Sequence, residues 1–131
     1  MNKFLLALTF IFSISATASA KVFIISPKDG AEVSSPFEVV FGLQGMGIAP
    51  AGINFPNTGH HHLLIDLDKL PDLKSGIPAD AQHLHFGKGQ TQATIELDPG
   101  EHSLQLLLGD WMHVPHETPV ISEKINISII D

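Results

Sequence analysis

The sequence predicts an all-β protein, an immunoglobulin-like antiparallel β-sandwich of about seven strands, with a small β-barrel as the alternative. Three observations lead to this prediction. Apolar residues alternate with a period of two along most of the chain after residue 20, and no segment carries the apolar stripe of an amphipathic helix. The alternating runs are short and are separated by glycine, proline and aspartate, which favour turns.

The first twenty residues are typical of a secretory signal peptide. Lys3 supplies a positive start, residues 4–14 are largely apolar, and residues 18–20 have the small side chains that precede a cleavage site. We therefore expect cleavage near Ala20, localisation in the periplasm or outside the cell, and a single β-sandwich domain over 21–131. Neither the apolar run nor any later segment has the roughly twenty apolar residues of a membrane span.

The strands follow in order. A short apolar strand is expected at 22–25, and 37–43 alternates so that Phe37, Val39, Phe41 and Leu43 share one face. Residues 44–59 are rich in glycine and proline, which predicts a long surface loop. The next alternating run, 60–67, places His61 and Leu63 on one face and His60 and His62 on the other.

The second half of the domain follows the same pattern. A loop at 68–80 and a short strand at 82–86 precede a clean alternation over 91–97. The Asp-Pro-Gly-Glu turn at 98–101 then leads into a strand with Leu104, Leu106 and Leu108, so we expect these two strands to form a hairpin. A loop at 109–119 precedes the last strand, which contains Ile121, Ile125, Ile127 and Ile129.

Composition excludes several functions. The chain has no cysteine, which rules out disulfides, cysteine-ligated zinc, iron–sulfur clusters and thiol catalysis. All seven basic residues are lysine, and the net charge is −7, so nucleic acid is not an expected partner. Eight histidines remain as the chemically distinctive residues.

Seven of the eight histidines fall in three groups, at 60–62, at 83 and 85, and at 113 and 116. On a strand, residues i and i+2 point to the same side about 6.6 Å apart, so His60 with His62, and His83 with His85, can each supply half of a metal site. A transition metal usually takes three or four protein donors at about 2 Å. Strand pairing, or closure of the loop at 113–116, would bring the halves together.

The candidate metal ligands are therefore six histidines and two methionines: His60, His62, His83, His85, His113, His116, Met46 and Met112. Thioethers favour Cu(I), so copper is the first choice of metal and zinc the alternative. The competing interpretation is that the histidines are solvent-facing, part of hydrogen-bond networks or turn caps, and that the methionines are apolar filler. His61 and His102 share faces with leucines and are expected to be hydrogen-bonded structural residues. Asp66, Asp68 and Asp110 are candidates to orient ligating imidazoles.

Four segments of the chain resemble a family of short exported bacterial proteins catalogued as a domain of unknown function: SPKDGAEVSSPFEVVFGLQGMGIAPAG, NTGHHHLLID, IPADAQHLHFGKGQTQATIEL and LQLLLGDWMHVPHETPVISEKI. The resemblance covers nearly all of 21–131. It implies export and an immunoglobulin-like sandwich but no established activity. A weaker likeness, through His83-Leu84-His85-Phe86-Gly87, is to copper/zinc superoxide dismutase. That family's disulfide and active-site arginine have no counterpart in a chain without cysteine or arginine.

These observations favour an exported, histidine-based transition-metal-binding protein for copper carriage or buffering. One alternative is an envelope module with structural histidines whose partner is another envelope protein. A more distant alternative is a metal-dependent enzyme of the superoxide-dismutase type. No nucleophile elbow, phosphate loop or helical zinc-protease motif is present, so we do not expect an enzyme. The sequence leaves the oligomeric state open.

Overall fold

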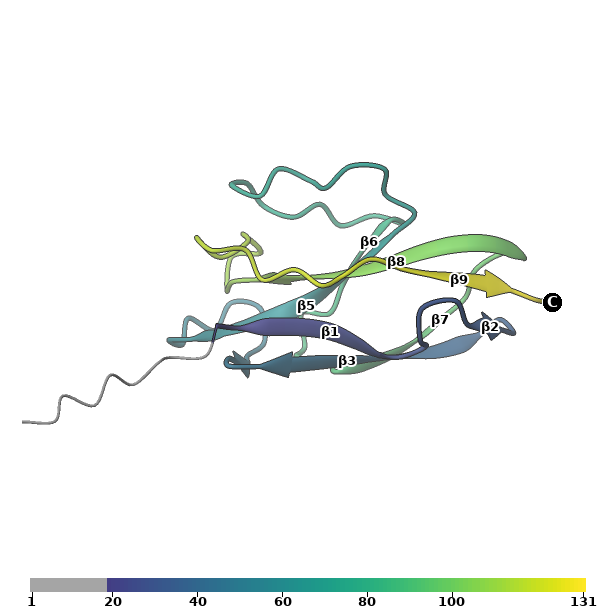
Figure 1. The fold of residues 1–131 in the computed structure, drawn as a ribbon. Coiled ribbons are helices and arrows are strands. Elements are labelled where there is room, and N and C mark those ends of the chain that lie inside the picture. Colours follow the sequence, from purple (N-terminus) through teal and green to yellow (C-terminus); the bar gives the residue numbers. More distant parts are fainter. Residues whose placement is uncertain (1–18) are drawn as a thin grey trace, which may run out of the picture.

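A computed structural model of the protein describes residues 19–131, which form two facing β-sheets (Figure 1). The prediction of an all-β sandwich is confirmed, and the barrel alternative is wrong because the two sheets do not close on each other. Residues 1–18, most of the predicted signal peptide, lie outside the described residues. Within 19–131 no helix is long and apolar enough to cross a membrane.

The smaller sheet has the order β1-β3-β7 and is antiparallel. Its strands are β1 (Lys21–Ser26), β3 (Phe37–Gln44) and β7 (Gln92–Ile95). The larger sheet has the order β2-β9-β8-β5-β4, and β6 also pairs with β5. Its strands are β2 (Glu32–Val33), β4 (Gly47–Ile48), β5 (Thr58–Ile65), β6 (His83–His85), β8 (Gly100–Gly109) and β9 (Ile125–Ile129). The short strands β2 and β4 pair parallel to β9 and β5.

The alternation of apolar residues builds the main core between the two sheets. Val39 and Phe41 face it from β3, and Leu63, Leu106 and Ile127 face it from the larger sheet, all at most 4% exposed. Burial of these side chains away from water supplies the main stabilisation of the sandwich.

Replacement of Phe41 or of Ile127 by alanine is expected to cost about 2 to 5 kcal/mol of unfolding free energy, because each change leaves a cavity on one inner face. Urea melts of the two variants measure this loss directly. Two melts that coincide with the wild type would contradict the assignment of both faces.

The strand β5 is buried on both faces, so its outward-pointing residues do not meet solvent. Figure 1 shows the long loop between β5 and β6 lying over the outer face of the larger sheet. Under it, Leu64 and Leu107 pack with Ile77 in a second apolar cluster. His60 and His62 point to the same side of β5 as Leu64 and are 0% and 1% exposed.

The predicted hairpin between 91–97 and the following strand is wrong. β7 pairs with β3, whereas β8 pairs with β5 and β9, so the turn at 98–101 carries the chain from one sheet to the other. The backbone NH of Leu97 donates to Ser35 Oγ. Gly100 has a φ of 131°, a backbone conformation that residues with a side chain rarely adopt. Turn residues mark a change of direction, but they do not determine which sheet the next strand joins.

Candidate metal centre

Strand pairing and one loop bring four histidines together on the outer face of the larger sheet. His60 and His62 lie on β5, and the register of β5 with β6 places His62 opposite His85. The loop after β8 supplies His113. Each of the four residues offers one nitrogen, and these nitrogens all lie within 4.8 Å of one another. This set, His60, His62, His85 and His113, is called the four-histidine group below.

Two nitrogen–nitrogen distances within the four-histidine group are close to the separation that a bound ion requires. His60 Nε2 lies 3.1 Å from His85 Nε2 and 3.1 Å from His113 Nδ1. A tetrahedral ion with metal–nitrogen bonds of about 2.0 Å would hold its nitrogens about 3.3 Å apart. A neutral imidazole nitrogen has one proton or one lone pair, so His60 Nε2 makes one good hydrogen bond and leaves the other close approach unsatisfied.

Burial keeps His60, His62 and His85 in the protonation state that binds metal. Desolvation, together with nearby His85 and His113, lowers the pKa of His60 from 6.5 to about 4. Desolvation also lowers the pKa of His62 to about 3, and that of His85 is lowered for the same reason. The Nδ1 atoms of His60 and His62 are buried without a hydrogen-bond partner among the described residues. Neutral imidazoles with free lone pairs fit a transition metal.

The turn that carries His113 is fixed by Asp110. One carboxylate oxygen of Asp110 accepts hydrogen bonds from the backbone NH groups of Met112 (2.8 Å) and Val114 (2.9 Å). The NH of Ile77 donates to the carbonyl of His113 at 2.8 Å, and His113 itself has a φ of 65°. Asp110 therefore positions His113 through the backbone, and its negative charge partly opposes the lowering of the His60 pKa.

Two glycines give room to two of the rings. A Cβ on Gly109 would lie 2.7 Å from Cε1 of His62, and a Cβ on Gly87 would overlap Cε1 of His85 and lie 2.6 Å from its Nε2. Sequence reasoning missed both glycines. Their positions in the sequence could have indicated this role. Gly87 follows His85 in His-Phe-Gly, and Gly109 begins the loop that carries His113, in Leu-Gly-Asp.

Two other predicted ligands, His83 and His116, bond to partners outside the four-histidine group. His83 Nδ1 lies 2.7 Å from Asp80 Oδ1, although His83 is two residues from His85 on the same strand. His116 Nε2 donates to the carbonyl of Thr58 at 3.0 Å. Met46 is half-buried against the main core, and Met112 is 55% exposed.

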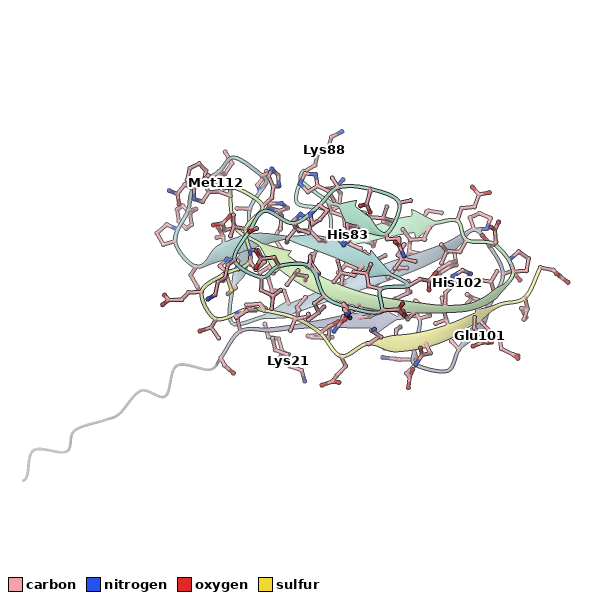
Figure 2. The ribbon with its side chains drawn as sticks, turned by 90° about the horizontal axis from the view of Figure 1, so that it is seen from above. Lys21, His83, Lys88, Glu101, His102 and Met112 are labelled. Carbon is pink, nitrogen blue, oxygen red and sulfur yellow. The ribbon has the colours of Figure 1, made fainter. Side chains whose placement is uncertain are left out.

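The two histidines expected to be structural differ in their contacts. His102 confirms the expectation, since its Nδ1 lies 2.7 Å from Asp66 Oδ2 and its Nε2 lies 2.8 Å from the Asp98 carbonyl. Figure 2 shows it on β8, away from the loop that carries Met112. His61 is buried as expected, but neither ring nitrogen has a hydrogen-bond partner among the described residues. Its ring packs against Phe41 with centroids 5.0 Å apart, and desolvation lowers its pKa to about 4.

Asp66 and Asp110 do not contact the imidazoles of the group as orienting carboxylates would. Asp66 bonds to His102 and to the backbone NH of Ser103. Asp110 bonds to backbone NH groups. The position of His113 is thus set by the conformation of its loop.

Comparison with known proteins places the chain in a family. The sequence model of the family described as "Domain of unknown function (DUF4399)" matches residues 39–130, so the chain belongs to this family. A search of curated proteins found no match. Among solved structures, the endo-beta-1,4-mannanase from Thermotoga petrophila is similar over 89% of this chain, with 17% identity and a TM-score of 0.52. The match spans only 21% of the mannanase chain, and at this identity it shows a shared fold alone.

Proposed function

We propose that this DUF4399 protein binds one transition-metal ion through His60, His62, His85 and His113, and that it carries or buffers copper outside the cytoplasm. The observation that carries the proposal is the convergence of four imidazole nitrogens within 4.8 Å of one another. Export is supported by the signal-peptide pattern of the first twenty residues.

Copper is preferred for the donor chemistry of the group. Affinity for divalent metals at nitrogen sites rises to a maximum at Cu(II) and is lower for Zn(II). Met46 packs against the main core and the Met112 side chain is 55% exposed, so we base the choice of copper on the imidazoles alone. We therefore assign Cu(II) as the first choice, bound by Nε2 of His60 and His85, by Nδ1 of His113 and by one ring nitrogen of His62, with zinc as the alternative.

Titration of the metal-free, tag-free protein tests the proposal. We expect one Cu(II) per chain, bound more tightly than micromolar, and weaker binding of Zn(II). The single tryptophan, Trp111, lies two residues from His113, so paramagnetic Cu(II) should quench its fluorescence while Zn(II) should not. Isothermal titration without a saturable heat would contradict the proposal and favour the interaction module.

Binding should persist into mild acid. Protons compete with a metal only near or below the pKa of the free ligand, and burial lowers the pKa of His60 to about 4 and that of His62 to about 3. An imidazole with an ordinary pKa of about 6.5 would lose about tenfold in availability at pH 5.5. We expect these two ligands to add almost nothing to the loss of Cu(II) affinity between pH 7.5 and 5.5. Competition titrations at both pH values measure the Cu(II) affinity. A fall as steep as competition by four protons, one on each histidine, would contradict the lowered pKa values of His60 and His62.

The two glycines should respond differently to alanine. The His85 ring is exposed and can swing away, so Gly87→Ala should weaken Cu(II) binding at least tenfold with little change in melting temperature. The His62 ring is 1% exposed and cannot move freely, so Gly109→Ala should lower both affinity and melting temperature. Gly76→Ala is the control, because nothing lies within 4 Å of its added methyl group. Unchanged affinity in both test variants would show that the ring positions do not matter.

A further inference from the structure

Four large apolar side chains are exposed on two neighbouring loops beside the four-histidine group. Ile53 and Phe55 lie between β4 and β5 and are 53% and 66% exposed; Trp111 and Met112 follow β8 and are 41% and 55% exposed. The NH of Gly52 donates to the carbonyl of Trp111 at 2.9 Å, which joins the two loops. These four side chains are called the apolar rim.

The loop that bears Phe55 is held rigidly. Thr58 Oγ1 donates to the carbonyl of Phe55 at 2.8 Å, and the NH of Ile53 donates to the carbonyl of Pro50 at 3.1 Å. The side chain of Asn57 donates to the carbonyl of Gly45 at 3.1 Å. Phe55 is thus fixed in an exposed position, so a partner that covers it need not order the loop first. Preorganised aromatic residues of this kind are typical anchors of protein interfaces.

A cavity of about 500 Å³ opens next to this loop. Its lining includes Asn57, two residues from Phe55, together with Met46, Thr118, Pro119 and Val120, and also the ionisable residues His116 and Glu117. Ser19 and Ala20, which the expected cleavage near Ala20 removes, line it as well. The apolar part of this lining suits a phenyl ring. A protruding aromatic residue and an apolar cavity therefore lie side by side on the same end of the molecule.

The charge distribution favours a second copy as the occupant. The chain carries a net charge of −7, yet residues 39–65 contain no aspartate, glutamate or lysine. Glu117 is the one acidic residue in the lining of the cavity, so the loop and the cavity together carry little of the molecule's negative charge, and two copies meet there with little repulsion. The same net charge disfavours contact with an anionic lipid surface.

We infer that two copies of this chain pair about a two-fold axis, with Phe55 of each inserted into the cavity of the other beside Asn57 and Val120. A two-fold axis brings the same surface of both copies together. Because Phe55 and the cavity are neighbours on that surface, each copy's Phe55 can enter the other copy's cavity at the same time. Ile53 and Trp111 would lie at the margin of this contact. The inference goes beyond the proposed metal function and does not depend on it.

Sedimentation equilibrium tests the pairing, using protein produced from the full sequence by a bacterial host and kept free of metal. We expect a dimer at tens of micromolar. Phe55→Asp should weaken dimerisation at least a hundredfold without changing the thermal melt or the affinity for Cu(II). Leu70→Asp is the matched control, because Leu70 is 43% exposed on a different loop, and this variant should remain a dimer.

Cysteine cross-linking tests the contact itself, since the chain has no cysteine of its own. An oxidised mixture of Phe55→Cys and Thr118→Cys should give mainly the mixed disulfide dimer, because Phe55 of one copy faces the cavity of the other. A monomer at 100 μM, or a dimer that survives Phe55→Asp, would overturn the inference. So would a monomer whose Trp111 fluorescence shifts to shorter wavelength with phosphatidylcholine vesicles, since the rim would then bind lipid.

The two proposals fail separately. A monomer that binds Cu(II) leaves the metal function in place and removes the dimer. A dimer that binds neither Cu(II) nor Zn(II) retains the pairing and removes the metal function.

Discussion

Replacement of His60 by alanine is expected to weaken Cu(II) binding at least a hundredfold, the largest effect of any single substitution in the four-histidine group. His60 Nε2 lies 3.1 Å from His85 Nε2 and 3.1 Å from His113 Nδ1. The alanine variant loses one metal donor. It also loses the ring that the His85 and His113 rings contact. Competition titration with a chelator of known affinity measures the loss.

The stability of this variant needs a control, because His60 is 0% exposed and its truncation leaves a cavity under the covering loops. His85→Ala provides it. The His85 side chain is exposed, so this variant should also lose affinity strongly while its metal-free melt stays close to the wild type.

His83→Ala and His116→Ala are the matched negative controls. Both residues belong to the histidine clusters of the sequence, but their rings bond to Asp80 and to the Thr58 carbonyl. We expect neither variant to lose more than about threefold in Cu(II) affinity. Affinity that survives His60→Ala but falls with His83→Ala would place the ion elsewhere.

Replacement of His61 by leucine is expected to stabilise the metal-free protein, most strongly in acid. His61 lies in the main core with both ring nitrogens unpartnered, so an apolar side chain of similar size removes the cost of a buried polar group. Such a cost is about 1 to 3 kcal/mol. Urea melts in the presence of a chelator, at pH 7.5 and pH 4.5, measure the change.

The pH dependence follows from the lowered pKa. Burial holds the pKa of folded His61 at about 4, while the unfolded chain has the ordinary value of 6.5. The unfolded state therefore binds an additional proton as pH falls from 6.5 to about 4, and the folded state loses stability over that window. At pH 4.5 the loss amounts to about 2 to 3 kcal/mol for this residue. His60 and His62 act in the same direction, so the variant should reduce the acid loss without abolishing it.

His102→Ala should behave in the opposite way. Burial opposes the charged form of His102, but the hydrogen bonds to Asp66 and to the Asp98 carbonyl outweigh it and raise the pKa. Its contribution to stability is present below pH 6.5 and is lost as the pH rises through the raised value. The alanine variant should therefore lose more stability at pH 5.5 than at pH 8.5. Two results together would contradict the pKa directions given for His102 and His61. One is an equal loss of stability in His102→Ala at pH 5.5 and pH 8.5, and the other is a His61→Leu variant that loses as much stability in acid as the wild type.

The sequence by itself determined the longer strands and their faces, but it missed the two-residue strands β2 and β4, the second of which lies in the predicted loop at 44–59. Side-chain direction on a strand has a period of two, a local property that is readable from one segment. It separated His61, which faces the main core, from His60 and His62, which face the covering loops. The same alternation identified Phe41 and Ile127 as core residues. The all-β class and the outline of the sandwich followed from it.

Only the tertiary structure decided which histidines meet. His83 and His85 have the same spacing as His60 and His62, yet only His85 joins the four-histidine group. The register of β6 with β5 places His85 opposite His62 but His83 opposite Leu64, and the His83 ring lies against Asp80. His113 joins and His116 does not, because Asp110 fixes one turn and the Thr58 carbonyl holds the other ring. The pairing of β7 with β3 was equally hidden in the sequence. The pairing of β5 with β6, the bond between His116 and Thr58, and the pairing of β7 with β3 all join residues far apart in the chain. Such contacts form only when strand order and loop paths bring the segments together.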